Sequence, residues 1–354
     1  MRMKKLFFLA AIAAIAVSCA KTHEITPVRE QTIGFNTWAN NLTKSTHMNF
    51  AANAKFDVFG YKQTGETKTT VFNGDDVTYD GEAWNYSEVQ FWDRSSDNYT
   101  FFAITPANIV ATDPSPAQTG LFVTNDITFN GKNNDVMIAE KKIVGSDNYG
   151  LEVGLVFHPK AALLDLKFKK AKNLKEADVK INSVVLEDIQ TSGHLTVTKY
   201  EGDNTPLATW SLASTPIKDD FDNTHGITPV TLPVTIAKGT AHGTENSQFL
   251  INNLIVMPQT LLTNEQKLTI DYTVTASGKN FNRTRTIDLN LFDLTDMSPT
   301  AGREEDAQNT EPFLTTWEAG KHYTYYLTIN ADLIVFSATV ADWSDVNAFR
   351  YIIN

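Results

Sequence analysis

Residues 321–342 read KHYTYYLTINADLIVFSATVAD, and apolar and polar side chains alternate along most of this stretch. The apolar positions before the polar break at 330–332 are Tyr323, Tyr325, Leu327 and Ile329, and those after it are Ile334, Phe336, Ala338 and Val340. A period of two places every second side chain on the same side of a strand, and the break Asn-Ala-Asp consists of turn-forming residues. The stretch therefore predicts a β-hairpin with one apolar face and one polar face.

The same alternation recurs around tight-turn dipeptides elsewhere in the chain. A second hairpin is predicted over residues 268–291, with its turn at Ser277-Gly278, and a third around Asp80-Gly81. Asp-Gly accepts the positive φ angles of a two-residue hairpin turn. Amphipathic helix patterns are scarce, so the sequence predicts an all-β protein of antiparallel β-sandwiches.

Chain length and polar segments predict how the strands are divided. The 354 residues suffice for two domains with a core each. The polar segment 145–150 marks the expected boundary, which gives domains over 32–147 and 148–354. Residues 106–120 hold three prolines and are expected to form a surface loop, because proline cannot serve a central strand. Residues 303–312 are expected to form a second, acidic loop.

The N-terminus has the pattern of an export signal. Arg2, Lys4 and Lys5 precede an apolar run of twelve residues from Leu6 to Val17. A membrane-spanning helix needs about 20 apolar residues, so the run fits the central region of a signal peptide instead. Residues 1–18 are therefore predicted to be a signal peptide.

The apolar run ends in Ala16-Val17-Ser18-Cys19, which resembles the lipobox of bacterial lipoproteins. The resemblance implies that the Cys19 thiol receives a diacylglycerol and that cleavage before Cys19 makes it the new N-terminus. Residues 19–31 have no apolar periodicity and are predicted to form a tether between the lipid and the folded body. Cys19 is the only cysteine, so no disulfide within the chain is expected.

Composition argues against nucleic acid as a partner. The chain has 30 Lys and Arg residues against 41 Asp and Glu. Removal of residues 1–18 takes three cations and no acid, which leaves a net charge of −14. An acidic protein lacks the electrostatic attraction that supplies most non-specific nucleic-acid binding.

Sequence signatures of catalysis and of cofactors are missing. There is no nucleophile elbow, no P-loop, no dinucleotide fingerprint, and no pair of histidines at helical zinc spacing. We therefore expect neither an enzyme nor a bound cofactor or metal. Asp219, Asp220, Asp222 and Asn223 supply hard oxygen ligands that suit calcium, although a solvated turn explains them as well.

Four aromatic residues, Trp84, Tyr86, Phe91 and Trp92, lie close together in the sequence. They suit either a glycan-stacking platform or sandwich core. Trp84 and Tyr86 share one face of a strand, which favours the core.

Several short segments, in this order behind a lipobox, resemble the fimbrillins of type V pili, a family of surface lipoproteins that polymerise. The segments are TIGF at 32–35, FDVFGY at 56–61, YTFFAITP at 99–106, DVMIA at 135–139, LVFHPKAAL at 155–163, IVMPQ at 255–259, and 317–327 with 334–343. The resemblance implies two transthyretin-like β-sandwich domains. It also implies assembly by donor-strand exchange, in which a protease removes the first strand and a strand of another subunit fills the groove.

The resemblance assigns roles to three parts of the chain. The strand 32–38, with Ile33 and Phe35, corresponds to the excised strand. Lys44 lies in the polar run 40–48 that follows, and proteolysis concentrates in such exposed loops. Family maturation often occurs at arginine, so a lysine here leaves the protease open.

The C-terminal segment 348–354 has the alternation of a donor strand. Phe349, Tyr351 and Ile353 share one face of it. The other interpretation is that the segment forms an edge strand of its own domain.

The predicted function is a non-enzymatic structural subunit of a type V pilus that mediates surface adhesion, as a shaft or a tip subunit. Its expected location is the cell outer membrane, through the lipid on Cys19, and the fimbrium. Its expected partners are other fimbrillin subunits, of the same or of different chains. The alternative is a cell-surface glycan-binding lipoprotein, which a flat exposed row of rings near Trp84 would favour. A surface hydrolase is a third class and would need converging carboxylates in a cleft.

Overall fold

The computed structural model describes residues 31–39, 52–112, 122–131, 135–199, 207–213, 218–221, 232–241, 246–290, 314–330 and 334–342. β-strands dominate these residues, with short 3-10 helices such as η2 (Ser146–Asn148) and η3 (Lys172–Leu174) between them. The predicted all-β class is therefore confirmed. No helix of the described residues is long and apolar enough to cross a membrane.

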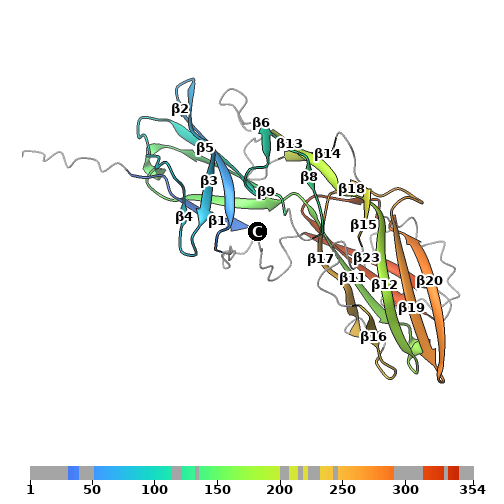
Figure 1. Cartoon of the computed structure of the whole chain (residues 1–354). Coiled ribbons are helices and arrows are strands. Elements are labelled where there is room, and N and C mark those ends of the chain that lie inside the picture. The colour runs from blue at the N-terminus through green and yellow to red at the C-terminus, as the bar shows by residue number, and fades with distance from the viewer. Residues whose placement is uncertain are drawn as a thin grey trace, which may run out of the picture.

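One sheet of seven strands makes up the N-terminal end of the molecule (Figure 1). Its strands in spatial order are β1 (Phe35–Ala39), β10 (Val153–Pro159), β9 (Met137–Val144), β5 (Asn98–Thr105), β2 (Lys55–Thr64), β3 (Thr67–Tyr79) and β4 (Trp84–Asn85). Neighbouring strands are antiparallel except β1 and β10, which run parallel. Alternate side chains of β2, β5 and β10, among them Phe56, Phe101 and Leu155, enter one hydrophobic cluster, to which the other strands also contribute.

Two further sheets make up the C-terminal end. One consists of β17 (Gln248–Val256), β11 (Ala162–Lys170), β22 (Lys321–Ile329) and β23 (Ile334–Asp342). The other consists of β15 (Lys218–Phe221), β12 (Asp178–Gln190), β19 (Lys267–Ala276) and β20 (Lys279–Asp288), with β16 (Val234–Ile236) also paired to β12. Leu166, Tyr272 and Leu327 belong to one cluster that both sheets share. The hairpins predicted over 321–342 and around Ser277-Gly278 are confirmed.

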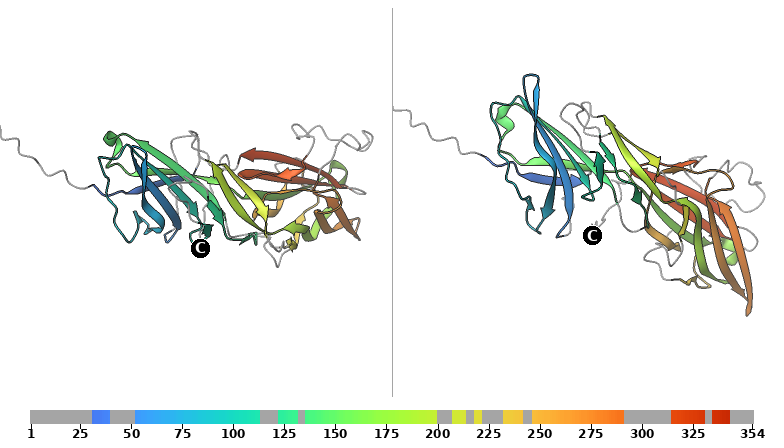
Figure 2. Two further views of the ribbon diagram at one scale, coloured as in Figure 1. Left: turned by 90° about the horizontal axis from the view of Figure 1, so that it is seen from above. Right: turned by 45° about the horizontal axis from the view of Figure 1, so that its top comes forward.

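A third region joins these two ends. It holds β6 (Val110–Thr112), β7 (Phe122–Thr124), β8 (Ile127–Thr128), β13 (Ser192–Lys199) and β14 (Leu207–Leu212), which form one sheet. Strands β18 (Gln259–Thr260) and β21 (Thr316–Trp317) pair separately. The buried residues of the region include Ile104, Phe129, Leu195 and Met257, so both halves of the chain contribute to its core. Figure 2 shows the resulting elongated molecule, with the seven-stranded sheet at one end.

Three sequence predictions differ from this arrangement. The expected boundary after residue 147 cuts the seven-stranded sheet, because β10 lies beyond it and pairs with β9 and β1. The expected loop over 106–120 contains the strand β6, which pairs with β7. Asp219 and Asp220 belong to β15 rather than to a loop, whereas Asp222 and Asn223 lie outside the described residues.

Candidate functional site

The first strand of the chain, β1, lies at the edge of the seven-stranded sheet and fills a groove in it. Ile33, Phe35 and Thr37 are buried, while Gly34 and Asn36 between them are half-buried. This alternation matches the period of two of a strand with one face on the core. The sequence predicted a strand over 32–38, and the structure gives a bridge at Thr32 followed by a strand over 35–39.

Main-chain groups hold this segment from two sides. On one side β1 runs parallel to β10, with Phe35 opposite Val153, and the Val153 amide donates to the Gly34 carbonyl at 2.7 Å. On the other side the segment 90–92 pairs with residues 31–33 in the antiparallel direction. The Ile33 amide donates to the Gln90 carbonyl at 2.9 Å, and the Trp92 amide donates to the Gln31 carbonyl at 2.9 Å. The groove therefore has two main-chain edges that any strand in it could pair with.

Phe35 occupies an aromatic pocket within the groove. Its ring lies 5.4 Å from that of Phe72, 5.8 Å from Tyr86, and 6.0 Å from both Phe56 and Phe101, measured between centroids, in edge-to-face geometry. Such pairs add about 0.5–1.5 kcal/mol each beyond the area that they bury. The four partner rings come from separate segments, so the pocket is a product of the whole sheet.

Polar side chains secure the segment around residues 31–33. The Tyr86 hydroxyl donates to the Ile33 carbonyl at 2.5 Å, and burial raises the pKa of this hydroxyl. Arg94 donates from Nη2 to Gln31 Oε1 at 2.9 Å. The Gln31 side chain lies against Gly150, where a Cβ atom would come within 1.9 Å of Oε1. Gly150 also has φ +96°, which disfavours any other residue there.

The predicted site residues fall partly outside the part of the chain that the structure describes. Cys19, Lys44, and Phe349, Tyr351 and Ile353 all lie outside it. Ile33 and Phe35 lie together in the groove as described above. The sequence does not predict that residues 90–92, Tyr86 and β10 bound the groove of β1, because each of them contacts β1 across a long separation in the sequence.

The aromatic residues near Trp84 do not form a flat exposed row. Trp92 is buried and stacks on Tyr149 with ring centroids 5.1 Å apart. Trp84 is half-buried and packs against Phe56 at 4.8 Å. Phe91 is exposed, so the core interpretation holds for three of the four residues.

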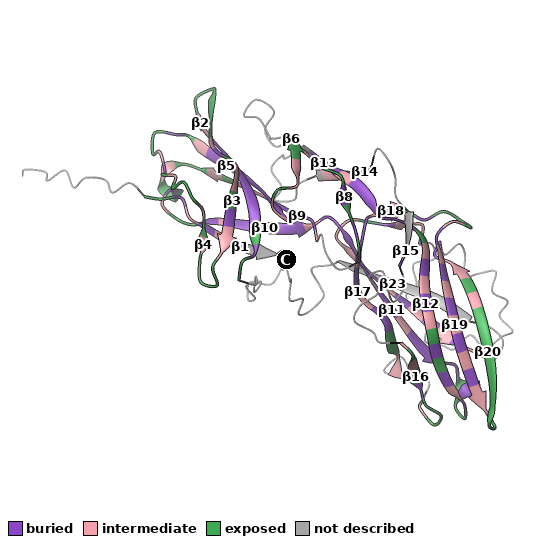
Figure 3. Cartoon of the chain, in the orientation of Figure 1, coloured by how far each residue is buried: buried purple, intermediate pink, exposed green. Residues whose placement is uncertain are grey.

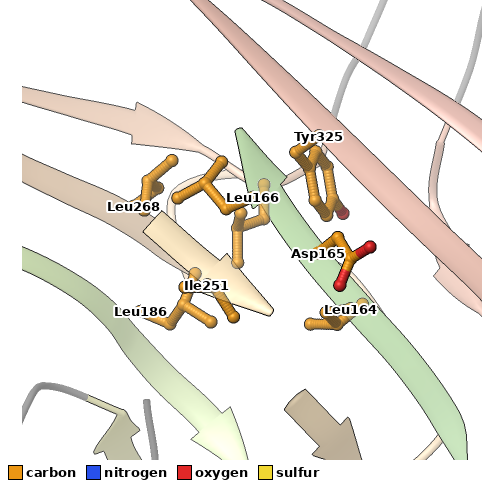
Figure 4. A pocket seen from close by; sticks show the side chains of 8 residues that line it. Leu164, Asp165, Leu166, Leu186, Ile251, Leu268 and Tyr325 are labelled. Atoms are coloured by element: carbon orange, nitrogen blue, oxygen red, sulfur yellow. The ribbon is translucent and has the colours of Figure 1, made fainter. Parts of the chain in front are cut away.

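The C-terminal end contains a small cavity inside its core (Figure 4). Leucine and isoleucine side chains surround it, together with Asp165 and Tyr325. The Asp165 carboxylate accepts the Asn253 amide at 2.8 Å and lies 3.0 Å from His322 Nε2, so its oxygens serve the structure of β17 and β22. Within the described residues, no group of three or more potential metal ligands lies together.

Comparison with known proteins shows which proteins this chain resembles in sequence and in fold. A model of the fimbrillin-like family matches residues 43–343. Fimbrium subunit Fim1C of Phocaeicola vulgatus is 27% identical over 119 residues, which cover 30% of this chain and 31% of that protein. The chain thus matches about a third of the length of this relative. A crystal structure of a fimbrial protein from Bacteroides vulgatus has the same fold with a TM-score of 0.59, at 17% identity, over 88% of this chain and 99% of that one. Because the family match covers most of its length, the chain belongs to the fimbrillin-like family.

Proposed function

We propose that this chain is a non-enzymatic structural subunit of a fimbrium at the cell surface, and that it serves surface adhesion. Family membership supports the fimbrial role. The observation that carries the assembly mechanism is the edge position of β1, whose buried side chains fill a groove bounded by β10 and by residues 90–92. An edge strand can leave a sheet without breaking any other strand pair, which suits donor-strand exchange.

Removal of β1 would expose apolar pockets and unpaired main-chain groups together. Refilling the groove with three large side chains contributes roughly 1.5–3 kcal/mol each before ordering costs. The incoming strand would also restore the main-chain hydrogen bonds, which is the basis of β-augmentation. In this proposal the strand comes from another fimbrillin subunit. The segment 348–354 is the candidate donor, and the competing assignment is an edge strand of its own domain.

Processing would prepare the subunit in two steps. Signal cleavage before Cys19 and lipidation of its thiol anchor the precursor to the outer membrane through the tether 19–31. Cleavage after Lys44 then separates the body from both the lipid and the strand that holds Ile33 and Phe35. Replacing Cys19 with alanine should abolish incorporation of a radioactive fatty acid, and persistent label would contradict the lipid assignment.

The test of the proposed function is N-terminal sequencing of the protein from fibres sheared off the cell surface. We expect the protein in the fibre fraction with an N-terminus at Ser45 or within residues 40–48. Absence from the fibres would contradict the fimbrial role. Presence with residues 31–39 still attached would contradict strand removal while leaving the fimbrial role in place.

Glycan binding was the alternative function, and the aromatic residues do not favour it. Trp92 and Tyr86 contribute to the core around Phe35 rather than to a flat exposed platform. A screen of the purified protein against common polysaccharides should therefore give no binding that depends on Trp84.

A further inference from the structure

Large exposed hydrophobic side chains gather at the outer end of the seven-stranded sheet, where β1 begins. Among the described residues eight large hydrophobic side chains are exposed, and four of them lie on the two segments 89–91 and 144–151. The four are Val89 (54% exposed), Phe91 (46%), Val144 (60%) and Leu151 (66%), and they are called the collar below. Figure 2 shows that β1 starts at the end of the molecule remote from the C-terminal sheets.

Contacts among neighbouring residues place both collar segments around Gln31. The ring of Trp92, next to Phe91, stacks on that of Tyr149 at 5.1 Å. Arg94 links the segments, since it donates to Gln31 and, at 3.5 Å, to the Ser146 carbonyl. Gln31 in turn lies against Gly150, next to Leu151. The collar therefore flanks the mouth of the groove.

The main chain and the exposed side chains of the segment 89–92 make different contacts. The main chain of Gln90 and Trp92 bonds to residues 31–33, whereas Val89 and Phe91 display their side chains to solvent. A strand that replaced β1 would thus continue past exposed apolar side chains at the point where it leaves the groove. Exposed apolar groups next to such a binding groove mark an interaction surface.

We propose that the collar docks the body of the strand-donating subunit, a second copy of this chain, against the outer end of the seven-stranded sheet. This inference rests on the proposed function. The inference requires that the donor strand run in the same direction as β1. The residues that precede the donor strand then lie at the collar. Only residues 343–347 separate the end of β23 at Asp342 from the candidate donor 348–354. Five extended residues span roughly 17 Å, so the donating body must lie close to the groove mouth.

The first test replaces two collar residues in the full chain, in cells that assemble the fibre. Phe91→Ser with Leu151→Ser should lower the yield of sheared fibres at least tenfold, because the docking surface loses its apolar groups. Both side chains are exposed, so the melting temperature of the precursor and its cleavage should stay unchanged. Leu212→Ser with Leu262→Ser is the matched control, since these residues are similarly exposed but lie away from the collar, and it should assemble normally.

A second measurement identifies the occupant directly. A photo-crosslinking amino acid at position 151 should join two copies of the chain in fibres, with the crosslinked peptide in the C-terminal half of the second copy. The same group at position 212 should not form this crosslink. Crosslinks from position 151 only within one chain would overturn the inference.

The remaining outcomes separate this inference from the proposed function. If the unaltered chain forms no fibres, the proposed function fails and the collar proposal fails with it. If the collar variant assembles as well as the unaltered chain, only the collar proposal is overturned. The collar also lies near the lipid-bearing tether, so vesicles of phosphatidylethanolamine and phosphatidylglycerol are the probe for a membrane role. The collar would be a lipid contact instead if the Cys19→Ala chain binds these vesicles, the added collar substitutions abolish this binding, and the collar variant still gives a normal fibre yield.

Discussion

At the scale of single residues, Asp135 shows how a buried acid links this fold to pH. The residue is half-buried as a whole, but both carboxylate oxygens are buried and neither has a hydrogen-bond partner. Burial raises the pKa of this carboxyl to about 8. Asp135 directly precedes Val136, a member of the cluster that joins the two ends of the molecule.

Replacing Asp135 with asparagine should therefore stabilise the protein in a pH-dependent way. The folded-state pKa lies above the unfolded-state value of about 3.9, so the unfolded chain loses its proton first as pH rises. The free energy of unfolding is therefore not reduced by this carboxyl below about pH 4, and it falls as the pH rises from there toward 8. We expect the variant to gain on the order of 2–4 kcal/mol in the free energy of unfolding at pH 7, and almost nothing at pH 4.

Urea unfolding at pH 4, 6 and 8 measures this difference. The exposed residue Asp147 supplies the control, and Asp147→Asn should change the stability little at any pH. A gain for Asp135→Asn that is equal at pH 4 and pH 8 would contradict the assignment.

Lys170 is a second buried charged residue, and it organises main chain rather than pairing with an acid. Its Nζ donates to the carbonyl of Ala177 at 2.9 Å and of Ala237 at 2.7 Å, and burial lowers the pKa of the amine. Lys170→Met would remove this donor from both carbonyls, and the Ala237 carbonyl would keep only the Thr240 amide at 3.2 Å. We expect a cost of roughly 1–3 kcal/mol in the free energy of unfolding. The exposed Lys180→Met is the control for loss of a positive charge. Chemical denaturation should show the loss for Lys170 only, and equal effects of the two changes would refute this role.

At the scale of elements, β1 is an edge strand, so its removal leaves the rest of the seven-stranded sheet paired. Its contribution in the precursor comes chiefly from Phe35 in its pocket of four rings. Phe35→Ala should cost the precursor about 3–5 kcal/mol in the free energy of unfolding. The exposed Thr32→Ala should cost little by comparison.

The same substitution should have no effect on the assembled fibre, because β1 is absent from it in the proposed mechanism. Thermal unfolding of precursor and of sheared fibres, each with Phe35 or alanine, compares the two states. Equal destabilisation of precursor and fibre would show that β1 stays in place.

Sequence patterns predicted those elements whose pairing is local. The hairpin of β22 and β23 has alternating strands and a polar turn between them, so its register follows from residues that are neighbours in the sequence. β10 was assigned to the wrong side of a domain boundary, because the polar segment 145–150 next to it resembles a linker. In the structure that segment contains η2 and leads back into the same sheet.

The groove itself was only partly predictable for the same reason. The alternation of Ile33, Phe35 and Thr37 identifies a strand with one buried face, and the structure shows these side chains buried. Nothing in the sequence shows that residues 90–92 form the opposite edge, since this depends on an isolated bridge between Thr32 and Phe91. Long-range pairing of this kind leaves no periodic signal in either segment.

At the scale of the whole molecule, buried residues occur at both ends and in the region between them (Figure 3). The cluster with Phe56 occupies the N-terminal end and that with Leu166 the C-terminal end, while Ile104 and Leu195 meet in a third cluster between them. The groove mouth and the collar lie at the outer N-terminal end.

The central claim is that β1 must leave its groove before subunits join. Thr32 and Phe91 are opposite each other in an antiparallel bridge whose hydrogen bonds lie on either side of the pair. Cα atoms of such a pair lie about 4.5 Å apart, which is within the range of a disulfide. Thr32→Cys with Phe91→Cys can therefore tie β1 into the groove, and Cys19 is the only native cysteine that could interfere.

Fibre yield from cells that make this double variant, with and without reductant, is the most direct measurement. We predict that the oxidised variant is cleaved after Lys44 but forms no fibres, because β1 stays covalently in place. Reduction should restore assembly to the level of the Phe91→Cys single variant, which controls for the change to the collar. Fibre formation by the oxidised variant at the level of that single variant would contradict the account.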